Sequence, residues 1–294
     1  MIWLGEQYLF EEIFYEKSDR SGKIKIGIAH KKQVEVNGVK IKKLSELLGN
    51  LNLVIFTPDD IQILKNGPAE RRKFLDMMIG QLRPNYVHQL INYKNTIEQR
   101  NNYLRQIKEE NKPEEMLEIW DEKLAEYAQN ICKYRIEFIE KLKNKIKNIH
   151  LQITNEEIKL EYITECENKE KYLALLKQRR KLDIIKGFTT KGIHRDDFKV
   201  FLNEKEIGIF GSQGQHRTSI LSLKLAELYV IYDEIGEYPI LLLDDFMSEL
   251  DEKRRTSFLE NIKQTQVIIT CTDKMEVANS KVFYVKNGEI KTFS

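Results

Sequence analysis

Cysteine is scarce in this chain of 294 residues, and its scarcity excludes two kinds of site. The three cysteines, Cys132, Cys166 and Cys271, lie far apart and form no C-x-x-C pair. Such spacing supports neither a disulfide framework nor a structural zinc site. It is typical of a protein in a reducing compartment, so we expect a cytoplasmic location.

Long uncharged runs are also missing. The longest one extends from Leu47 to Pro58, well short of the roughly 20 residues needed to cross a bilayer. The apolar opening Met1–Glu6 has no basic stretch before it and is soon followed by Glu11 and Glu12, which argues against a signal peptide. We therefore expect no membrane partner.

Neither sign of charge is in excess, because 48 basic residues face 46 acidic ones and leave a net charge of +2. With 41% hydrophobic and 32% charged residues, the composition is that of a globular protein. The length allows one large or two intermediate domains. A nucleic-acid binder of this composition must gather its lysines and arginines on one face, because affinity depends on local phosphate contacts.

Glycine is absent between Asn85 and Leu182, where a single proline, Pro113, occurs. Apolar residues recur there at intervals of three and four, first over Tyr86–Ile107 and again over Leu117–Ile146. Such spacing places them on one face of a helix. The pattern predicts two long helices that pair as an antiparallel hairpin within a helical lobe.

Strand patterns flank this lobe on both sides, and they alternate with helical ones. The expected strands are Lys23–Ile28, Val34–Lys40, Leu51–Phe56, Phe198–Leu202, Ile240–Leu243, Val267–Cys271, Val282–Val285 and Ile290–Phe293, with a helix over Glu70–Gln81 and a break at Pro84. This arrangement predicts an α/β fold. One sheet domain would comprise residues 1–83 and 183–294, interrupted by an α-helical lobe at residues 84–182.

Four consecutive aliphatic residues followed by two carboxylates occupy Ile240–Asp245. A strand that is apolar on both faces belongs in the middle of a sheet. Asp244 at its carboxyl end would lie where open α/β sheets bind ligands, placed to hold Mg²⁺ on a nucleotide phosphate, and Asp245 could orient or deprotonate the attacking water. The alternative interpretation is an ordinary buried strand followed by an acidic turn.

A second pattern, Gly-Ser-Gln-Gly-Gln at Gly211–Gln215, precedes a helical repeat of Leu221, Leu225 and Leu228. Two glycines let a ligand approach the backbone closely, and the first turn of the following helix offers N–H groups to a phosphate. Taken alone, the segment is more often just a flexible loop that caps a helix.

The two patterns follow one another in the order and spacing of the ABC-type ATPase heads that include SMC proteins. Within that class the chain resembles the RecF family. The resemblance rests on segments spread over essentially the whole chain: Phe56–Asp60, Arg71–Asp76, Lys191–Asp197, Phe210–Gln215 and Leu241–Asp251. The helical lobe is matched in character more than in residues.

This resemblance implies an ATP-dependent homodimer that binds single-stranded or gapped DNA, meets recombination mediator proteins, and serves DNA repair, replication, recombination and the SOS response. It implies slow ATP hydrolysis in intact members, with Mg²⁺ as cofactor. The implied roles are a signature formed by Ser212, Gly214 and Gln215, a metal ligand at Asp244, a catalytic carboxylate at Asp245, a D-loop ending at Asp251, and switch residues Thr272 and Asp273.

One motif of that class is missing, because no G-x-x-x-x-G-K-[ST] sequence occurs in these 294 residues. Members of the family carry this Walker A loop near the amino terminus, and it supplies most contacts to the β- and γ-phosphates. We therefore expect weak ATP binding by this chain, and its activity as an enzyme stays open. A non-enzymatic protein that binds DNA or mediators is the alternative.

Candidate DNA contacts are local clusters of basic residues: Arg71, Arg72 and Lys73; the run Lys141–Lys147; Arg179 and Arg180; and Arg195. Basic runs on helices are usually solvated faces. Arg195 could instead pair with Asp196 or Asp197. The five histidines are scattered, and we expect each to be a surface residue or part of hydrogen-bonded structure.

Overall fold

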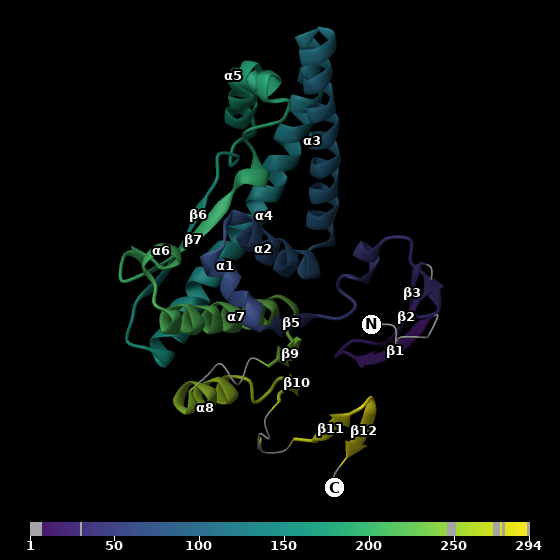
Figure 1. Ribbon diagram of the computed structural model, residues 1–294, viewed down its shortest axis with the longest axis vertical. Helices are drawn as coiled ribbons and strands as arrows, with labels where there is room; N and C mark the ends of the chain where they lie inside the picture. Colours follow the sequence, from purple (N-terminus) through teal and green to yellow (C-terminus); the bar gives the residue numbers. More distant parts are fainter. Residues whose placement is uncertain (1–7, 30, 246–250, 273–276, 278–279, 293–294) are drawn as a thin grey trace.

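An arm of helices rises from a base of sheets and shorter helices in the computed structural model (Figure 1). The structure describes residues 8–29, 31–245, 251–272, 277 and 280–292. The α-helices are α1 Gln62–Lys65, α2 Pro68–Leu82, α3 Pro84–Glu110, α4 Leu117–Ile153, α5 Lys169–Lys186, α6 Ile207–Phe210, α7 Gln213–Ile235 and α8 Glu252–Asn261. The strands are β1 Leu9–Glu16, β2 Ser21–Ile28, β3 Lys32–Val36, β4 Val39–Lys40, β5 Leu53–Phe56, β6 Ile158–Ile163, β7 Asp197–Leu202, β8 Lys205–Glu206, β9 Ile240–Asp244, β10 Val267–Thr270, β11 Phe283–Lys286 and β12 Glu289–Thr292.

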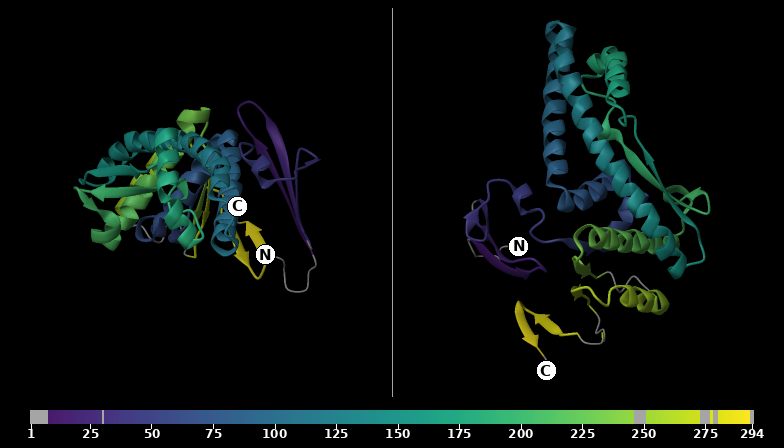
Figure 2. Two further views of the ribbon diagram at one scale, coloured as in Figure 1. Left: turned by 90° about the horizontal axis from the view of Figure 1, so that it is seen from above. Right: turned by 180° about the vertical axis from the view of Figure 1, so that it is seen from behind.

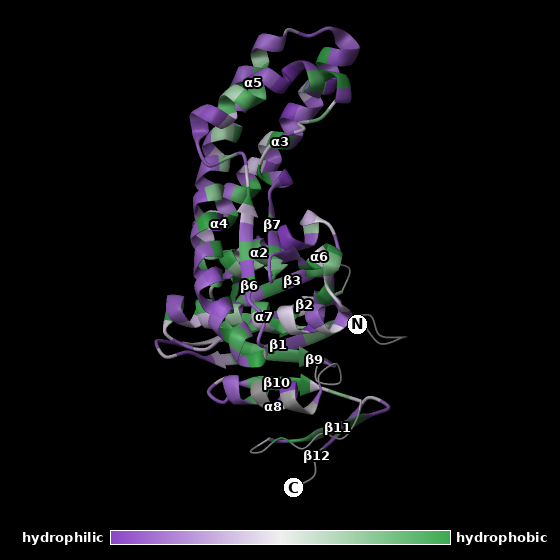
Figure 3. Cartoon of the chain, turned by 90° about the vertical axis from the view of Figure 1, so that its left-hand side faces the viewer, coloured by the Kyte–Doolittle hydropathy of each residue, from purple (hydrophilic) through white to green (hydrophobic). Residues whose placement is uncertain are grey.

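The arm is the predicted hairpin of two long helices, α3 and α4, which lie side by side in both Figure 1 and Figure 2. At its tip Leu104, Ile107 and Leu117 form a small core of their own. The predicted break at Pro84 is present, because α2 ends at Leu82 and Pro84 begins α3, where a missing N–H costs nothing. Figure 3 shows long hydrophilic stretches along the outer side of this arm, as its exposure requires.

The parallel sheet at the base has the strand order β10-β9-β5. Strand β5 precedes the helical lobe in the sequence and β9 follows it, yet Val54 pairs with Leu241 in register. Both residues are fully buried. A sheet interrupted by a helical insertion is therefore confirmed, and the fold is the predicted α/β class.

Helix α7 forms the centre of the core beside this sheet. Leu221, Leu225 and Leu228, the repeat seen in the sequence, are completely buried. The helix begins after Ser212 and ends at Gly236, whose φ of 76° is the left-handed conformation that glycine adopts freely. Its buried residues lie all round the helix, because α4 and α2 cover what the sheet leaves open.

An antiparallel sheet, β6-β7-β8, departs from the expectation that residues 84–182 are all helical. Strand β6 alternates buried Ile158 and Leu160 with exposed Lys159 and Glu161, which is a strand pattern of period two. It pairs along its length with β7, which lies beyond the predicted lobe. The domain boundaries at residues 83 and 183 stay a prediction.

A separate sheet, β1-β2-β3-β4, closes over its own small core of Tyr15, Ile24 and Val34. The predicted Asn-Gly turn is present between β3 and β4, where Asn37 and Gly38 have φ values of 51° and 82°. A second hairpin joins β11 to β12. Within the described ranges, no helix has an apolar stretch long enough to span a bilayer.

Candidate functional site

The carboxyl ends of the three parallel strands meet at one edge of the sheet, which is where open α/β sheets bind ligands. Asp244 ends the central strand β9, and Thr270 ends its neighbour β10 directly opposite. The Thr270 hydroxyl donates a hydrogen bond to Asp244 Oδ1 at 2.6 Å. Because Asp244 is exposed, its carboxylate is open to a ligand while Thr270 holds one oxygen in place.

Asp245 turns the chain away from the sheet immediately after this carboxylate. Its φ of 48° lies in the left-handed region, which costs a residue with a side chain on the order of 1 kcal/mol. The Asp245 N–H donates to the Thr270 carbonyl at 3.1 Å and to the Thr270 hydroxyl at 3.2 Å. Thr270 thus fixes both carboxylate residues, one through its hydroxyl and one through the backbone.

The signature segment forms the amino-terminal cap of α7. Ser212 Oγ accepts a hydrogen bond from the Gln215 N–H at 3.2 Å, and the Gln215 side chain accepts one from the Ser212 N–H at 2.9 Å. This reciprocal capping box satisfies two groups that a helix start leaves open. Gln215 Nε2 also donates to Glu156 at 2.7 Å.

The two glycines of this segment differ in what surrounds them. A Cβ on Gly211 would lie 2.6 Å from the Ile207 carbonyl oxygen, whereas one on Gly214 would meet nothing within 4 Å. Gly211 is therefore required by internal packing. The open space at Gly214 leaves the backbone of the first turn accessible to an approaching group.

A buried ion pair on α7 itself was not foreseen from the sequence. Lys224 Nζ lies 2.6 Å from Glu227 Oε2, with both side chains under 10% exposed. The Lys224 ammonium also faces the rings of Phe56 and Phe74, at 5.8 and 5.4 Å from their centroids. Burial raises the pKa of Glu227 despite the lysine beside it. The spacing of three residues marked a possible helical pair, but nothing in the sequence indicated its burial.

The remaining nucleotide-site candidates are Asp251, Thr272 and Asp273. Asp251 caps α8, since its side chain accepts from the Arg254 N–H at 2.9 Å. Thr272 is exposed two residues after β10. Asp273 and residues 248–250 of the D-loop lie outside the described residues.

Three of the predicted DNA contacts are engaged inside the protein. Arg71 forms a two-pronged ion pair with Asp197, with N–O distances of 2.6 and 3.0 Å. Arg72 donates to the Asp196 carbonyl at 2.7 Å. Arg180 pairs with the buried carboxylate of Asp121 at 2.9 Å.

The other basic candidates divide into free and neutralised groups. Each lysine of the run Lys141–Lys147 has an acidic partner within 4.0 Å: Glu137, Glu140, Glu157, Asp233 or Glu234. Arg179 is half-buried. Lys73 and Arg195 are exposed, and within the described ranges neither has a carboxylate partner. Arg195 instead lies 6.0 Å from the Phe188 ring.

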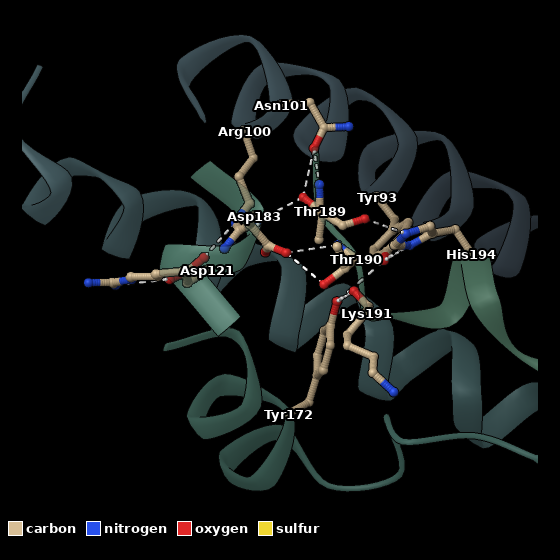
Figure 4. A network of polar contacts seen from close by, with 11 residues as sticks. Tyr93, Arg100, Asn101, Asp121, Tyr172, Asp183, Thr189, Thr190, Lys191 and His194 are labelled. Carbon is tan, nitrogen blue, oxygen red and sulfur yellow. Dashed lines mark hydrogen bonds and ion pairs between the residues drawn. The ribbon is translucent and has the colours of Figure 1, made fainter. Parts of the chain in front are cut away.

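A polar network ties the loop before β7 to three helices of the arm (Figure 4). Its centre is Arg100, which is fully buried and reaches Asp121 on α4 at 2.7 Å and Asp183 on α5 at 2.8 Å. Arg100 also donates to the Thr189 hydroxyl at 2.8 Å. Asp183 in turn accepts from the N–H and hydroxyl of Thr190.

A second network, around Arg135, anchors the far end of the same loop. Arg135 donates to the Ile193 carbonyl at 2.9 Å, to Asp196 at 3.2 Å and to Asp76 at 2.9 Å. Asp196 and Asp197 thus pair with Arg135 and Arg71, not with the adjacent Arg195.

Three histidines are structural within the described ranges. His150 is buried against Ser222 Oγ at 2.8 Å, and burial lowers its pKa to about 4. His194 bonds Tyr93 at 2.8 Å, and burial with two nearby arginines lowers its pKa to about 4. Burial also lowers the pKa of His216.

Comparison with curated proteins finds close relatives described as DNA replication and repair protein RecF. One, from Clostridium perfringens (strain SM101 / Type A), is 45% identical over 272 residues, covering 89% of this chain and 74% of that protein. Another, from Clostridium botulinum (strain ATCC 19397 / Type A), is 43% identical over 296 residues, covering 97% and 81%. No family model matches the chain.

Two similar solved structures are described as the recombination mediator protein RecF in the RecFOR pathway. The RecF–ATP structure has a TM-score of 0.92 at 39% identity, covering 99% of this chain and 81% of that one. The RecF–ATPrS structure has a TM-score of 0.90 at 37% identity, covering 99% and 82%. An Smc head domain from Pyrococcus furiosus has a TM-score of 0.52 at 17% identity, which is a likeness of fold alone.

Proposed function

The chain belongs to the RecF family, and from that premise we propose that it acts in recombinational DNA repair and replication as a mediator that binds single-stranded or gapped DNA. In the complete family site, nucleotide would bind between two copies of the head. The observation that supports this most directly is Asp244, held by Thr270 at the carboxyl end of the central strand.

Asp244 is the residue proposed to hold Mg²⁺ on the nucleotide. The donor set fits, because Mg²⁺ prefers oxygen ligands and commonly uses one or two carboxylates together with substrate phosphates and waters. In the part of the chain that the structure describes, no cluster of three His, Cys, Asp or Glu side chains forms a closed metal cage, so the phosphates would complete the coordination. When bound, Mg²⁺ would neutralise charge on the phosphates. Asp245 would orient the water.

Ser212, Gly214 and Gln215 are proposed to face the γ-phosphate of a partner copy. The capping box orders the first turn of α7, and Gly214 leaves its backbone open. A helix start presents N–H groups and a positive dipole end to an anion. Asp251, Thr272 and Asp273 would line the same composite site.

A non-enzymatic interaction protein is the second candidate function. It is favoured by one observation, the absence of a G-x-x-x-x-G-K-[ST] motif from these 294 residues. Titration of the chain with a fluorescent ATP analogue and Mg²⁺ separates the candidates. We expect no saturable binding at micromolar concentrations, and Asp244→Asn should change nothing. A micromolar Kd that Asp244→Asn weakens would show that another segment replaces the missing loop.

DNA contact is proposed for the free cations, Arg195 above all. We expect binding to a single-stranded or gapped oligonucleotide to be independent of sequence and to weaken steeply between 50 and 200 mM salt, by orders of magnitude if roughly six or more phosphates are contacted. Arg195→Ala should reduce the salt slope by about one. Lys143→Ala is the matched control, because Lys143 is already paired with Glu140. Strong sequence preference with little salt dependence would contradict this proposal.

A further inference from the structure

A groove of about 580 Å³ lies where α3 rises from the end of α2, and the nucleotide site does not use it. One part of its lining is aliphatic: Met77 on α2, and Val87, Leu90 and Ile97 on α3. The three α3 residues follow one another at intervals of three and seven, so they share one side of the helix. Met77 is 54% exposed, so this apolar lining is accessible from solvent.

The charged residues of the lining are mostly cations. Arg72, Lys73, Lys94 and Arg135 contribute positive charge, against the single carboxylate of Asp76. That carboxylate already accepts hydrogen bonds from Arg135 and Tyr86. Arg135 also pairs with Asp196, so the positive charge that no carboxylate offsets among the described residues comes mainly from Lys73 and Lys94.

Two of these cations are available to a partner. Lys73 and Lys94 are exposed, and among the described residues no acidic group pairs with either of them. Among the described residues, Arg72 donates to a backbone carbonyl, that of Asp196. Burial is the main reason that the pKa of the Arg72 guanidinium is lowered, and the charge of Arg135 lowers it further.

The aliphatic lining of the groove favours a peptide over single-stranded nucleic acid as its occupant. Proteins that hold single-stranded nucleic acid combine cations with exposed aromatic rings on which bases stack. Two rings line this groove, Tyr93 and His194, and both are held by the protein: Tyr93 is buried, and His194 is hydrogen-bonded to Tyr93 and to the Thr189 carbonyl. An apolar anchor surrounded by opposite charge is instead the usual chemistry of peptide recognition.

We propose that this groove docks a peptide segment of a partner protein, in which a bulky apolar side chain is flanked by aspartates or glutamates. The apolar side chain would lie against Met77, Leu90 and Ile97, and the carboxylates would pair with Lys73 and Lys94. The proposal goes beyond the nucleotide and DNA functions, because it assigns a protein partner to a surface away from Asp244 and does not require DNA binding to be correct.

Three pools of fluorescent hexapeptides test the specificity. The first carries Asp or Glu at four positions and Leu, Ile, Phe or Trp at two; the second replaces the apolar residues by Ser; the third replaces the acids by Lys. Fluorescence anisotropy with the full chain should show at least tenfold tighter binding of the first pool than of the other two. Equal binding of the first two pools would overturn the proposal, since charge alone would then explain it.

Substitutions locate the site. Lys73→Glu with Lys94→Glu should weaken the first pool at least tenfold. Lys123→Glu with Lys133→Glu changes charge equally at exposed lysines of α4, and it should leave affinity unchanged. Met77→Ser should weaken the first pool at least threefold without affecting the second, and circular dichroism verifies folding of each variant.

An oligonucleotide of twelve thymidines provides the competing outcome. If it binds with an affinity that Lys73→Glu with Lys94→Glu abolishes, while the first peptide pool shows no preference, the groove is a DNA surface and the peptide proposal is wrong. Peptide binding that survives the double substitution would also refute it.

Discussion

Arg100→Met should destabilise the helical arm by more than the loss of one side chain's hydrogen bonds would suggest. Arg100 is 0% exposed and pairs with Asp121 and Asp183, which are also 0% exposed. Removing one partner of a buried ion pair leaves charge without compensation and costs about 3–5 kcal/mol. In Arg100→Met, the buried carboxylates of Asp121 and Asp183 would have Arg180 as their one remaining cation.

The imbalance between two carboxylates and one arginine also predicts which second substitution should recover part of the lost stability. Arg100→Met combined with Asp183→Asn leaves Asp121 paired with Arg180, and the amide oxygen introduced at position 183 can still accept from Thr190. The double variant should therefore recover about 1 kcal/mol or more relative to Arg100→Met alone, although Asp183→Asn by itself is destabilising. Such a non-additive result is the signature of direct coupling.

Urea unfolding and hydrogen exchange measure the effect. The Thr189 N–H donates to Asn101 and the Thr190 N–H to Asp183, so their exchange in Arg100→Met should accelerate roughly 100-fold or more if the local stability falls by about 3 kcal/mol. Arg105→Met is the control, because Arg105 is exposed and its hydrogen bond is to Asn102 on the same helix. A loss under about 1 kcal/mol, or strict additivity in the double variant, would refute the reasoning.

Two further predictions concern His150 on α4 and the two glycines before and within the first turn of α7. The folded-state pKa of His150, about 4, lies below its ordinary value of 6.5, so the stability that neutral His150 contributes should be complete above pH 6.5 and decline by about 3 kcal/mol as pH falls toward 4. Urea titrations at several pH values should show a flatter decline in His150→Gln, and the wild-type decline in the exposed control His88→Gln. A wild-type decline in His150→Gln would contradict the assignment of this pH dependence to His150. Gly211→Val should lower the melting temperature by several degrees, because its Cβ would lie 2.6 Å from the Ile207 carbonyl oxygen. Gly214→Ala should leave the melting temperature equal or slightly higher, because a Cβ there meets nothing within 4 Å. Equal losses in the two variants would show that packing does not distinguish the two glycines.

Strand β9 was predictable because its sequence admits few alternatives. Four aliphatic residues in a row require burial on both faces, and a parallel central strand provides it. Strand β6 was missed because lysine and glutamate, which occur within it, are also abundant in the surrounding helical lobe. Its alternation of Ile158, Lys159, Leu160 and Glu161 carried the signal, but so short a strand does not outweigh the long helical pattern around it.

The site was predictable only as far as local sequence determines it. Asp244 at a strand end and Ser212 at a helix cap follow from the order of residues nearby. The bond from Thr270 to Asp244 depends on β10 lying beside β9, 26 positions away. Pairing of Arg71 with Asp197 spans 126 positions, so a basic cluster that suggested DNA contact contains an arginine that stabilises the fold.

The loop before β7 shows why charge in a motif need not mean contact with a ligand. Asp196 reaches Arg135 on α4, and Asp197 reaches Arg71 on α2. Two adjacent carboxylates thereby fasten the arm and the base to one short segment. Because buried charges are costly unless they are paired, turning either arginine outward would take the ion-pair partner from a carboxylate that is buried, Asp196, or partly buried, Asp197. Lys73, Lys94 and Arg195, in contrast, are exposed and pair with no carboxylate among the described residues, so they can take part in electrostatic recognition without loosening this segment.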